Sequence, residues 1–213
     1  MSADTTRDNW DADYSRKGSL YGGAPHQLPP FPAGSRVLEA GCGNGKLLSA
    51  MVHRDWCVTA IDFSPRAALM ARATAREGSG AGVVVADART IPFRDGSFDG
   101  VAANHILAHG MAADRSRIAR ELCRVLRPGG QLWFCDFSTR DFRNGAGHEA
   151  EPGTFVRGNG ILTHYFSDNE VAGLFLGLDT VSVQRHDWIL RVRGKEYIRS
   201  EITALFRKPP VTP

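Results

Sequence analysis

The residues best suited to chemistry lie in a glycine-rich segment, VLEAGCGNGKLL, at residues 37–48. Gly41, Gly43 and Gly45 separate a short apolar run from a second run that can form a helix. Glycine adopts positive φ angles and lets a ligand approach the backbone, and the start of a helix offers free N–H groups. The segment therefore predicts a ligand-binding loop, with the carboxyl group of Glu39 just before it.

Two further acids follow this loop at regular positions. Asp62 ends the next expected strand, and Asp87 ends the one after it. A carboxylate at such a strand end can accept hydrogen bonds from both hydroxyls of a ribose. The dinucleotide fingerprint G-x-G-x-x-G requires a third glycine where this chain has Lys46. The pattern thus favours a nucleoside ligand, although each acid alone would also suit a helix N-cap.

Short β-rich runs alternate with helical patterns along the chain, and this order positions the acids. The runs are nearly continuously apolar, which is typical of parallel strands buried on both faces. Strand–helix alternation indicates an α/β doubly wound sheet. The expected strands are residues 36–40, 57–62, 82–87, 98–104 and 130–137, and the expected helices run from Gly45 to about His53 and over 64–77 and 112–126.

The end of the chain has a different pattern. Two strand-like runs, residues 180–192 and 197–209, are joined by RGKE and predict an antiparallel hairpin. The whole chain is then one domain with a seven-stranded, mostly parallel, Rossmann-like sheet. We expect an N-terminal lid at 1–33, a core at 34–138, a glycine-rich, irregular substrate-side insertion at 139–166, and a C-terminal helix and hairpin at 167–213.

Composition sets limits on function. The 213 residues are 42% hydrophobic and 23% charged, with a net charge of +3, which alone does not indicate a nucleic-acid-binding protein. From Arg185 to Lys208 there are seven Lys or Arg, which form either a solvated face or a phosphate-contacting stripe. No apolar run approaches the roughly 18 residues of a membrane span. We expect no membrane association.

The four cysteines form no CxxC pair and have no metal-ligand spacing. They lie in or beside apolar runs, which indicates reduced thiols, and the N-terminus has no apolar segment of a secretory signal. His105 and His109 lie four residues apart without the glutamate of an HExxH motif. We therefore expect a cytoplasmic protein with no metal.

The E-x-G-x-G-x-G pattern from Glu39 to Gly45 resembles the first signature of the class I S-adenosylmethionine-dependent methyltransferases. PFRDGSFDGVAANHIL and LCRVLRPGGQLWFCDF resemble the fourth-strand and helix–turn–strand signatures of that class, so that residues 34–138 are covered closely. The resemblance implies S-adenosyl-L-methionine as the cofactor.

The resemblance also implies roles for individual side chains. Asp62 would bind the ribose, and Asp87, helped by the backbone N–H of Ala88, would bind the adenine amino group. The cofactor-binding residues implied in this way are Tyr14, Arg16, Tyr21, Glu39, Gly41, Cys42, Gly43, Asn44, Gly45, Asp62, Phe63, Ser64, Asp87, Ala88, Arg89, Asn104 and His105.

Residues 10–23, WDADYSRKGSLYGG, resemble the N-terminal lid of several small methyltransferases. In that role Tyr14 and Tyr21 would cover the site, and Arg16 or Lys17 would reach the carboxylate of the methionine part. The alternative is a surface helix that packs Trp10 and Tyr14 into the core. Both interpretations place this segment against the body of the domain.

The acceptor depends on the flanking segments. FVRGNGILTHYFSDNEVAGLFLGLDTV and the final RKPP resemble the tRNA 3-methylcytidine methyltransferases, without a counterpart of their long basic N-terminal extension. Methyl transfer is an in-line displacement that needs alignment, exclusion of water and, for some acceptors, removal of a proton. His164, Tyr165 and His105 are the candidates for catalytic roles.

Three hypotheses follow for the activity. The first is methyl transfer to a small-molecule acceptor, and the second is methyl transfer to a tRNA or other RNA base. The third is a noncatalytic cofactor-binding or regulatory domain, which the intact loop, Asp62 and Asp87 argue against. The sequence leaves the oligomeric state open.

Overall fold

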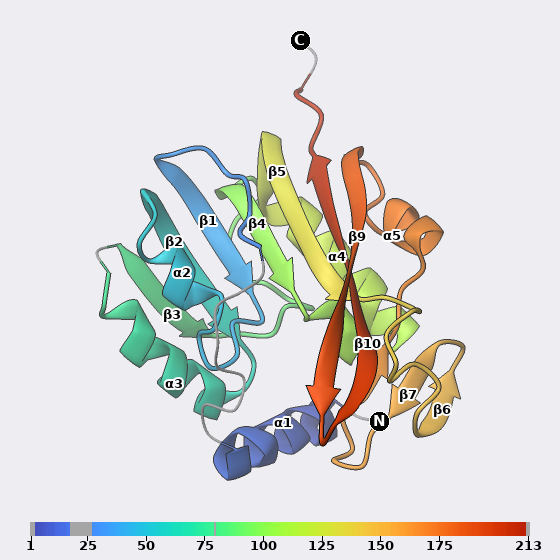
Figure 1. Cartoon of the computed structure of the whole chain (residues 1–213). Coiled ribbons are helices and arrows are strands. Elements are labelled where there is room, and N and C mark those ends of the chain that lie inside the picture. Colours follow the sequence, from blue (N-terminus) through green and yellow to red (C-terminus); the bar gives the residue numbers. More distant parts are fainter. Residues whose placement is uncertain (1–2, 18–26, 79, 212–213) are drawn as a thin grey trace.

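A seven-stranded sheet forms the centre of the computed structural model, which describes residues 3–17, 27–78 and 80–211 (Figure 1). The strand order is β3-β2-β1-β4-β5-β10-β9. The strands are β1 (Ser35–Ala40), β2 (Trp56–Asp62), β3 (Ala81–Val85), β4 (Phe98–Asn104), β5 (Leu126–Phe137), β9 (Asp179–Val192) and β10 (Lys195–Arg207).

Strands β1 to β5 are parallel to one another, whereas β10 is antiparallel to both β5 and β9. Parallel strands bring their carboxyl ends to one edge, where doubly wound sheets bind ligands. The predicted fold class, an α/β Rossmann-like sheet closed by an antiparallel hairpin, is confirmed.

Helices cover both faces of the sheet and divide the core in two. One apolar cluster packs under α2 (Leu48–Met51) and α3 (Pro65–Ala75), and the other under α4 (Ala112–Val125) and α5 (Asp168–Leu174). Along β1, Val37 belongs to the first cluster and Leu38 to the second, as the two-residue period of a strand requires. The sheet is therefore buried on both faces, and this rigid layer holds its edge loops in place.

Local sequence explains where two of these helices begin and what they bury. The side chain of Ser64 accepts the backbone N–H of Ala67 and caps α3, with Pro65 in the first turn. In α4, Ile118, Leu122 and Val125 face the sheet and are buried. The α-helical part after the glycine loop is shorter than predicted, because only residues 48–51 are helical and turns surround them.

Two predicted boundaries differ from the structure because strand pairing overrides local signals. The RPGG segment is not a separate turn, since Leu126 already pairs with Phe98 and the register then shifts so that Gln131 pairs with Gly100. The segment is thus a bulge within β5. β3 ends at Val85, so that Asp87 and Ala88 lie in the loop after the strand.

The sequence predicts that residues 139–166 are irregular, but part of this segment is regular in the structure. They contain a small antiparallel sheet of β6 (His148–Glu151), β7 (Thr154–Val156) and β8 (Leu162–His164). Gly153, with φ of 73°, lies between β6 and β7 and permits the tight reversal. Strands of three or four residues carry too little periodicity to be detected against so many glycines.

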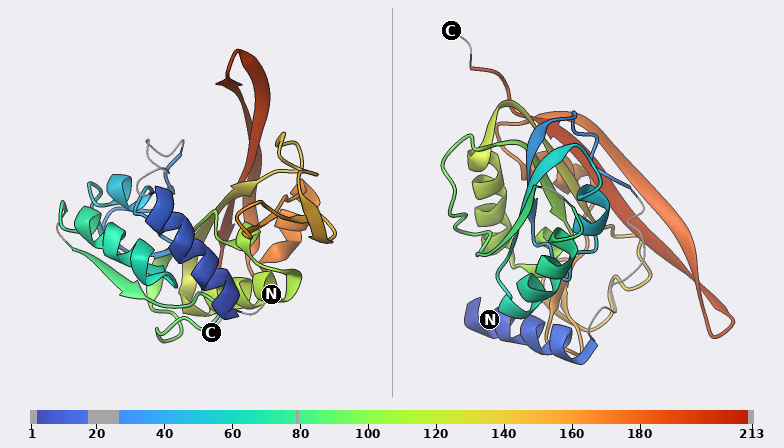
Figure 2. Two further views of the ribbon diagram at one scale, coloured as in Figure 1. Left: turned by 90° about the horizontal axis from the view of Figure 1, so that it is seen from below. Right: turned by 90° about the vertical axis from the view of Figure 1, so that its left-hand side faces the viewer.

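The β9–β10 hairpin extends well beyond the sheet (Figure 2). β10 pairs with β5 only from Glu201 onwards, whereas it pairs with β9 from Lys195. The turn is shorter than the predicted RGKE, because Arg193 and Gly194, with φ of 49° and 77°, alone connect the strands. Positive φ at both turn residues matches the right-handed twist of a hairpin. We call residues 187–200 the hairpin arm.

α1 (Ala3–Lys17) lies across the edge where the parallel strands end (Figure 1). Short helical turns at η1 (Leu107–His109) follow β4 at the same edge. Among the residues that the structure describes, no helix has the length and apolar character needed to cross a membrane.

The aromatic packing under α5 yields a stability prediction. Phe134 is fully buried, with the rings of Phe166 and Phe175 at 5.3 and 6.0 Å between centroids. Phe134→Ala should lower the free energy of unfolding by about 3–5 kcal/mol in urea denaturation, because the cavity cannot refill. The control, Phe142→Ala, removes a ring that is 42% exposed. Equal losses in both variants would contradict this account of the core.

Candidate functional site

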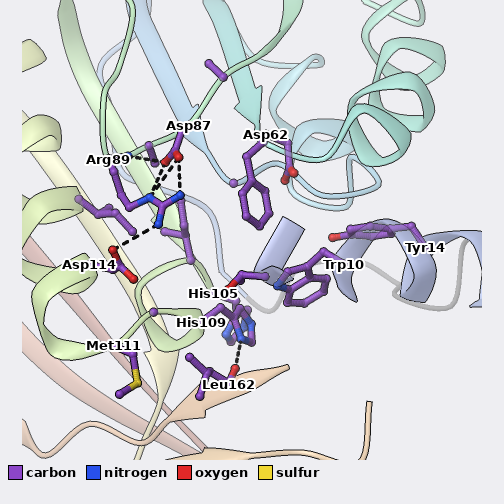
Figure 3. A pocket seen from close by; sticks show the side chains of 18 residues that line it. Trp10, Tyr14, Asp62, Asp87, Arg89, His105, His109, Met111, Asp114 and Leu162 are labelled. Carbon is purple, nitrogen blue, oxygen red and sulfur yellow. Dashed lines mark hydrogen bonds and ion pairs between the residues drawn. The ribbon is translucent and has the colours of Figure 1, made fainter. Parts of the chain in front are cut away.

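A cavity of about 820 Å³, part of it open to solvent, lies at the carboxyl edge of the parallel strands (Figure 3). Its walls come from the loops after β1, β2, β3 and β4 and from α1. We call it the first cavity. Its lining includes Trp10, Tyr14, Gly41, Asp62, Asp87 and His105.

The glycine loop has the backbone that its sequence predicts. Gly41, Gly43 and Gly45 have φ of 72°, 54° and 88°, a region that favours glycine. A Cβ on Gly43 would lie 2.6 Å from the hydroxyl oxygen of Tyr14. The loop therefore allows the hydroxyl group of Tyr14 to approach it closely, and a side chain there would force the ring of Tyr14 to move.

The carboxylate of Asp62 joins two backbone segments. Its Oδ2 accepts the N–H of Gly43 at 2.9 Å, and its Oδ1 accepts the N–H of Ser64 at 2.9 Å. Burial raises the pKa of Asp62 to about 6, although these two hydrogen bonds lower it. The side chain thus fixes the glycine loop against the start of α3 and still lines the first cavity.

Glu39 lies buried beneath the glycine loop. Its carboxyl group accepts the backbone N–H of Leu48, while its Oε2 atom has no hydrogen-bond partner. Burial, and then the charge of Asp62, raises the pKa of Glu39 to about 8. A buried acceptor without a donor is costly, and a cationic or N–H group placed against it would remove that cost.

Asp87 is held by an arginine two residues later. Arg89 donates from Nη2 to Asp87 Oδ2 at 2.6 Å and from Nη1 to Asp114 Oδ1 at 3.3 Å. Burial raises the pKa of Asp87, but the hydrogen bonds and charge of Arg89 lower it by more. In the part of the chain that the structure describes, the N–H of Ala88 donates to no group, and Ala88 lines the first cavity.

His105 occupies an unusual place directly after β4. Its φ is 51°, and its backbone N–H donates to the carbonyl oxygen of Cys135 at 2.8 Å. Nδ1 lies 3.4 Å from Asp136 Oδ1, and Nε2 lies 3.2 Å from Glu201 Oε1. Burial lowers the pKa of His105, but the two carboxylates outweigh it and raise the pKa to about 9.

His164 and Tyr165 line neither the first cavity nor the smaller cavity beside it. The ring of His164 is buried, with Nδ1 2.7 Å from Thr154 Oγ1 and Nε2 2.8 Å from Glu170 Oε1. Tyr165 is 2% exposed and packs within the core under α4 and α5. His164 thus joins the small sheet to α5, Tyr165 packs near Phe137 and Phe155, and the catalytic role of both stays a prediction.

The other predicted residues are divided between the cavity and its supports. Phe63 lines the first cavity, whereas Asn104 lines the smaller one. Cys42 is buried behind the loop and Asn44 is half-buried at its tip. Arg16 is exposed and lies 3.5 Å from Asp13. Tyr21 lies outside the described residues.

Sequence analysis missed several residues of the first cavity. The ring of Trp10 stacks on that of Tyr14 at 5.5 Å and meets His109 edge-on at 4.8 Å. His109 Nδ1 donates to the carbonyl oxygen of Leu162 at 2.7 Å, which ties the small sheet to the cavity. The sequence places Trp10 and Tyr14 together only in the alternative of a surface helix, and their spacing of four residues is the signal that they share one face.

The basic stripe of Arg185–Lys208 is largely engaged within the chain. Arg185 pairs with Asp168, Arg191 with Glu196 and Arg199 with Asp141, and the ammonium group of Lys208 donates to two backbone carbonyls. These contacts offset much of the positive charge that the sequence suggests. Arg193 and Lys195 stand at the exposed tip of the hairpin arm.

Comparison with known proteins identifies the class. Residues 38–134 match the family described as a methyltransferase domain. The chain is 30% identical over 205 residues to the tRNA N(3)-methylcytidine methyltransferase Mettl2 of Drosophila melanogaster, covering 86% of this chain and 63% of that protein. It is 36% identical over 135 residues to a ubiquinone biosynthesis O-methyltransferase of Xanthomonas oryzae, covering 58% and 54%.

A solved S-adenosylmethionine-dependent methyltransferase of Methanosarcina mazei has a similar fold, with a TM-score of 0.69 and 24% identity over 86% of this chain and 99% of that one. The chain spans less than two thirds of each of the two relatives. Residues 38–134 match the methyltransferase domain family, and this match together with the methyltransferase relatives supports the predicted class I S-adenosylmethionine-dependent methyltransferase, whose fold the solved structure shares.

The residues present fit the cofactor of this class. S-adenosylmethionine carries an amino group, a ribose and an adenine, and it has no phosphate. The buried, unpartnered oxygen of Glu39 suits the amino group, and the N–H of Ala88 suits an adenine nitrogen. The glycines keep the loop free of side chains that would fill the space under Tyr14.

The close approach of Tyr14 to the glycine loop can be tested with a methyl group. Gly43→Ala should weaken binding of S-adenosylhomocysteine about tenfold in calorimetry, because alanine is strained at this φ and its Cβ meets Tyr14. The control is Gly82→Ala in β3, where a Cβ meets nothing within 4 Å. Unchanged affinity in Gly43→Ala would contradict the proposed packing.

The raised pKa of Glu39 predicts a pH-dependent stability. The folded pKa is about 8 and the ordinary value is 4.5, so between these values the unfolded chain loses the proton that the folded chain keeps. Wild type should therefore lose stability relative to Glu39→Gln from pH 5 to pH 8, by on the order of 3 kcal/mol. Urea unfolding measures this difference. The exposed Glu77→Gln is the control, and a difference constant with pH would refute the assignment.

Proposed function

We propose that the chain binds S-adenosyl-L-methionine in the first cavity and catalyses transfer of its methyl group to a small-molecule acceptor. The observation that carries the proposal is the convergence of the glycine loop, Asp62 and the Asp87–Ala88 segment on one cavity. These groups come from three different strand ends, and a plain turn would not require them together.

Each side chain has a distinct task in this proposal. Asp62 orients the ribose while it holds the loop, and Glu39 receives the amino group. Trp10 and Tyr14 cover the cavity from α1 and exclude water, which supports a lid function for the N-terminal residues 1–33. When bound, the cofactor supplies a methyl group on a positively charged sulfur. The protein then needs to align the acceptor and, for some acceptors, to accept a proton.

A tRNA or other RNA base is the second candidate acceptor. One relative is named as a tRNA methyltransferase, and the hairpin arm carries Arg193 and Lys195 at its tip. The ion pairs of Arg185, Arg191 and Arg199 reduce the charge that remains for phosphates. The relative in ubiquinone biosynthesis supports a small-molecule acceptor, and we therefore place RNA second.

A cytoplasmic location belongs to the same proposal. The four cysteines are all free, and Cys42 and Cys135 are buried. Free, buried thiols are usual in a reducing compartment.

The proposed activity can be measured without knowing the acceptor. Purified protein would receive S-adenosylmethionine with a tritiated methyl group, together with either a deproteinised small-molecule extract or total tRNA. We expect label in the small-molecule fraction. Label in tRNA, falling steeply between 50 and 200 mM salt, would favour the RNA alternative because phosphate contacts release counterions. No label in either fraction would overturn the proposal.

Asp62→Asn tests the binding step separately. The amide keeps the size of the side chain but supplies only one acceptor oxygen, so the loop and the ribose lose a partner. S-adenosylhomocysteine should bind about tenfold or more weakly in calorimetry. Asp99→Asn at the opposite end of the sheet, where Asp99 contacts Arg36 and Arg127, is the control. Equal affinities in the two variants would count against Asp62.

A further inference from the structure

A second cavity of about 470 Å³ opens beside the first one, at the carboxyl end of β4 and alongside β5 and β10. Its lining is rich in polar groups and includes Lys46, Asn104, Cys135, His186 and Glu201. His105 lines both cavities. One side chain therefore stands where a group transferred from the first cavity would meet a molecule in the second.

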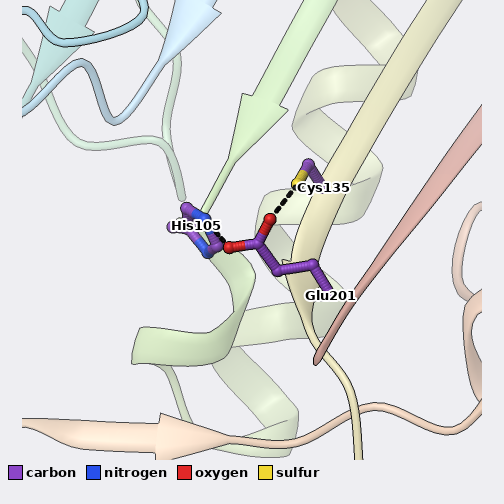
Figure 4. A group of neighbouring side chains, drawn as sticks. All are labelled: His105, Cys135 and Glu201. Atoms are coloured by element: carbon purple, nitrogen blue, oxygen red, sulfur yellow. Dashed lines mark hydrogen bonds and ion pairs between the residues drawn. The ribbon is translucent and has the colours of Figure 1, made fainter. Parts of the chain in front are cut away.

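His105 is fixed at this junction from three sides. Its backbone N–H donates to the carbonyl oxygen of Cys135, and its Nδ1 faces Asp136 of β5. Its Nε2 faces Glu201 of β10 (Figure 4). The carboxylate of Asp136 is fully buried, and its other oxygen accepts the N–H of Ala108 at 2.9 Å. The ring is still 27% exposed, so one part of it remains accessible.

We propose that the second cavity receives the acceptor and that His105, positioned by Asp136 and Glu201, removes a proton from it, so that the acceptor is an O–H or N–H nucleophile. This inference rests on the proposed function. It names a class of acceptor, and it assigns Asp136 and Glu201 as positioning residues that no sequence signal indicates.

The step balances without any further reactant. A lone pair of the acceptor oxygen or nitrogen forms a bond to the methyl carbon, the carbon–sulfur bond breaks, and its electron pair stays on sulfur. In neutral His105, Nδ1 keeps its N–H toward Asp136, and the acceptor takes the place of the Glu201 contact at Nε2, so that the acceptor proton passes to Nε2 and then to solvent. The N3 atom of neutral cytidine carries no proton, so its methylation would need no such base. A proton-accepting site thus favours a hydroxyl or amine over cytidine N3.

The charges around His105 define the pH dependence. Asp136 and Glu201 face the ring directly, Cys135 donates from Sγ to Glu201 Oε2 at 3.8 Å, and Lys46 and His186 line the same cavity. His109 follows on η1 in the first cavity. Because the two carboxylates raise the pKa of His105 to about 9, the neutral base becomes more abundant as the pH rises. The rate of transfer should therefore increase up to about pH 9.

The first test follows the titration of His105 by NMR with labelled histidine, and His105→Asn identifies its signal. Asparagine tolerates the positive φ of this position. Glu201→Gln removes one of the two charges and should lower the pKa of His105 by about one unit. Glu196→Gln on the same strand, exposed at the hairpin arm, should leave it unchanged. An equal titration in wild type and Glu201→Gln would overturn the proposed positioning.

The second test uses the tritium transfer described above over a range of pH. Glu201→Gln should move the rising part of the rate profile to lower pH, which a purely structural role would not do. His105→Asn should lower the rate at saturating S-adenosylmethionine about 100-fold. If wild type transfers label and Glu201→Gln has the same profile, this inference fails although the proposed function stands. If wild type transfers no label at all, both this inference and the proposed function fail.

Two product findings would also decide the inference. Label recovered as an O-methyl or N-methyl group that replaced a proton supports it, and label at N3 of cytidine overturns it.

Potential metal-ligand atoms of His105, Cys135 and Glu201 lie within 4.8 Å of one another. Metal analysis of the purified protein should therefore accompany the assay, and one equivalent of zinc lost in Cys135→Ser would overturn the role of His105 as a base.

Discussion

The cavity at the sheet edge depends on one buried carboxylate. The two oxygens of Asp62 hold the N–H groups of Gly43 and Ser64, so one side chain fixes the glycine loop relative to α3. A carboxylate is buried at a cost unless it is hydrogen-bonded, and these two bonds offset that cost only in part, as its raised pKa of about 6 shows. The loop, the support of Tyr14 on it and the position of Glu39 beneath it all follow from this contact.

Sequence predicted the parts of the fold that local chemistry determines. The apolar strands, the Ser64 cap and the glycines at positive φ each follow from one short segment. The bulge at RPGG and the small sheet within 139–166 were missed, because pairing with distant strands decides them. Three-residue strands have no periodicity of their own.

Sequence could predict only the part of the site that the ends of the parallel strands supply. Asp62, Asp87 and His105 each follow a strand, so their meeting at one edge follows from the parallel topology. The approach of Glu201 to His105 depends on the antiparallel register of β10 against β5, in which Glu201 pairs with Phe137. No spacing in the sequence encodes that register. The burial of His164 likewise depends on contacts with Thr154 of β7 and Glu170 of α5, which the pattern of its own segment does not indicate.

The two cavities draw on different parts of the chain. The segment matched by the methyltransferase domain family, residues 38–134, supplies the glycine loop, Asp62 and the Asp87–Ala88 loop, whereas Cys135, His186 and Glu201 lie beyond it. β10 is held against β5 only from Glu201 onwards, so the hairpin arm can change without disturbing the sheet. His186 and Glu201, which flank the arm, line the second cavity and not the first, so substitutions there would alter the second cavity while the glycine loop, Asp62 and the Asp87–Ala88 loop stay unchanged. Such a division allows one way of binding the methyl donor to serve acceptors of different chemistry.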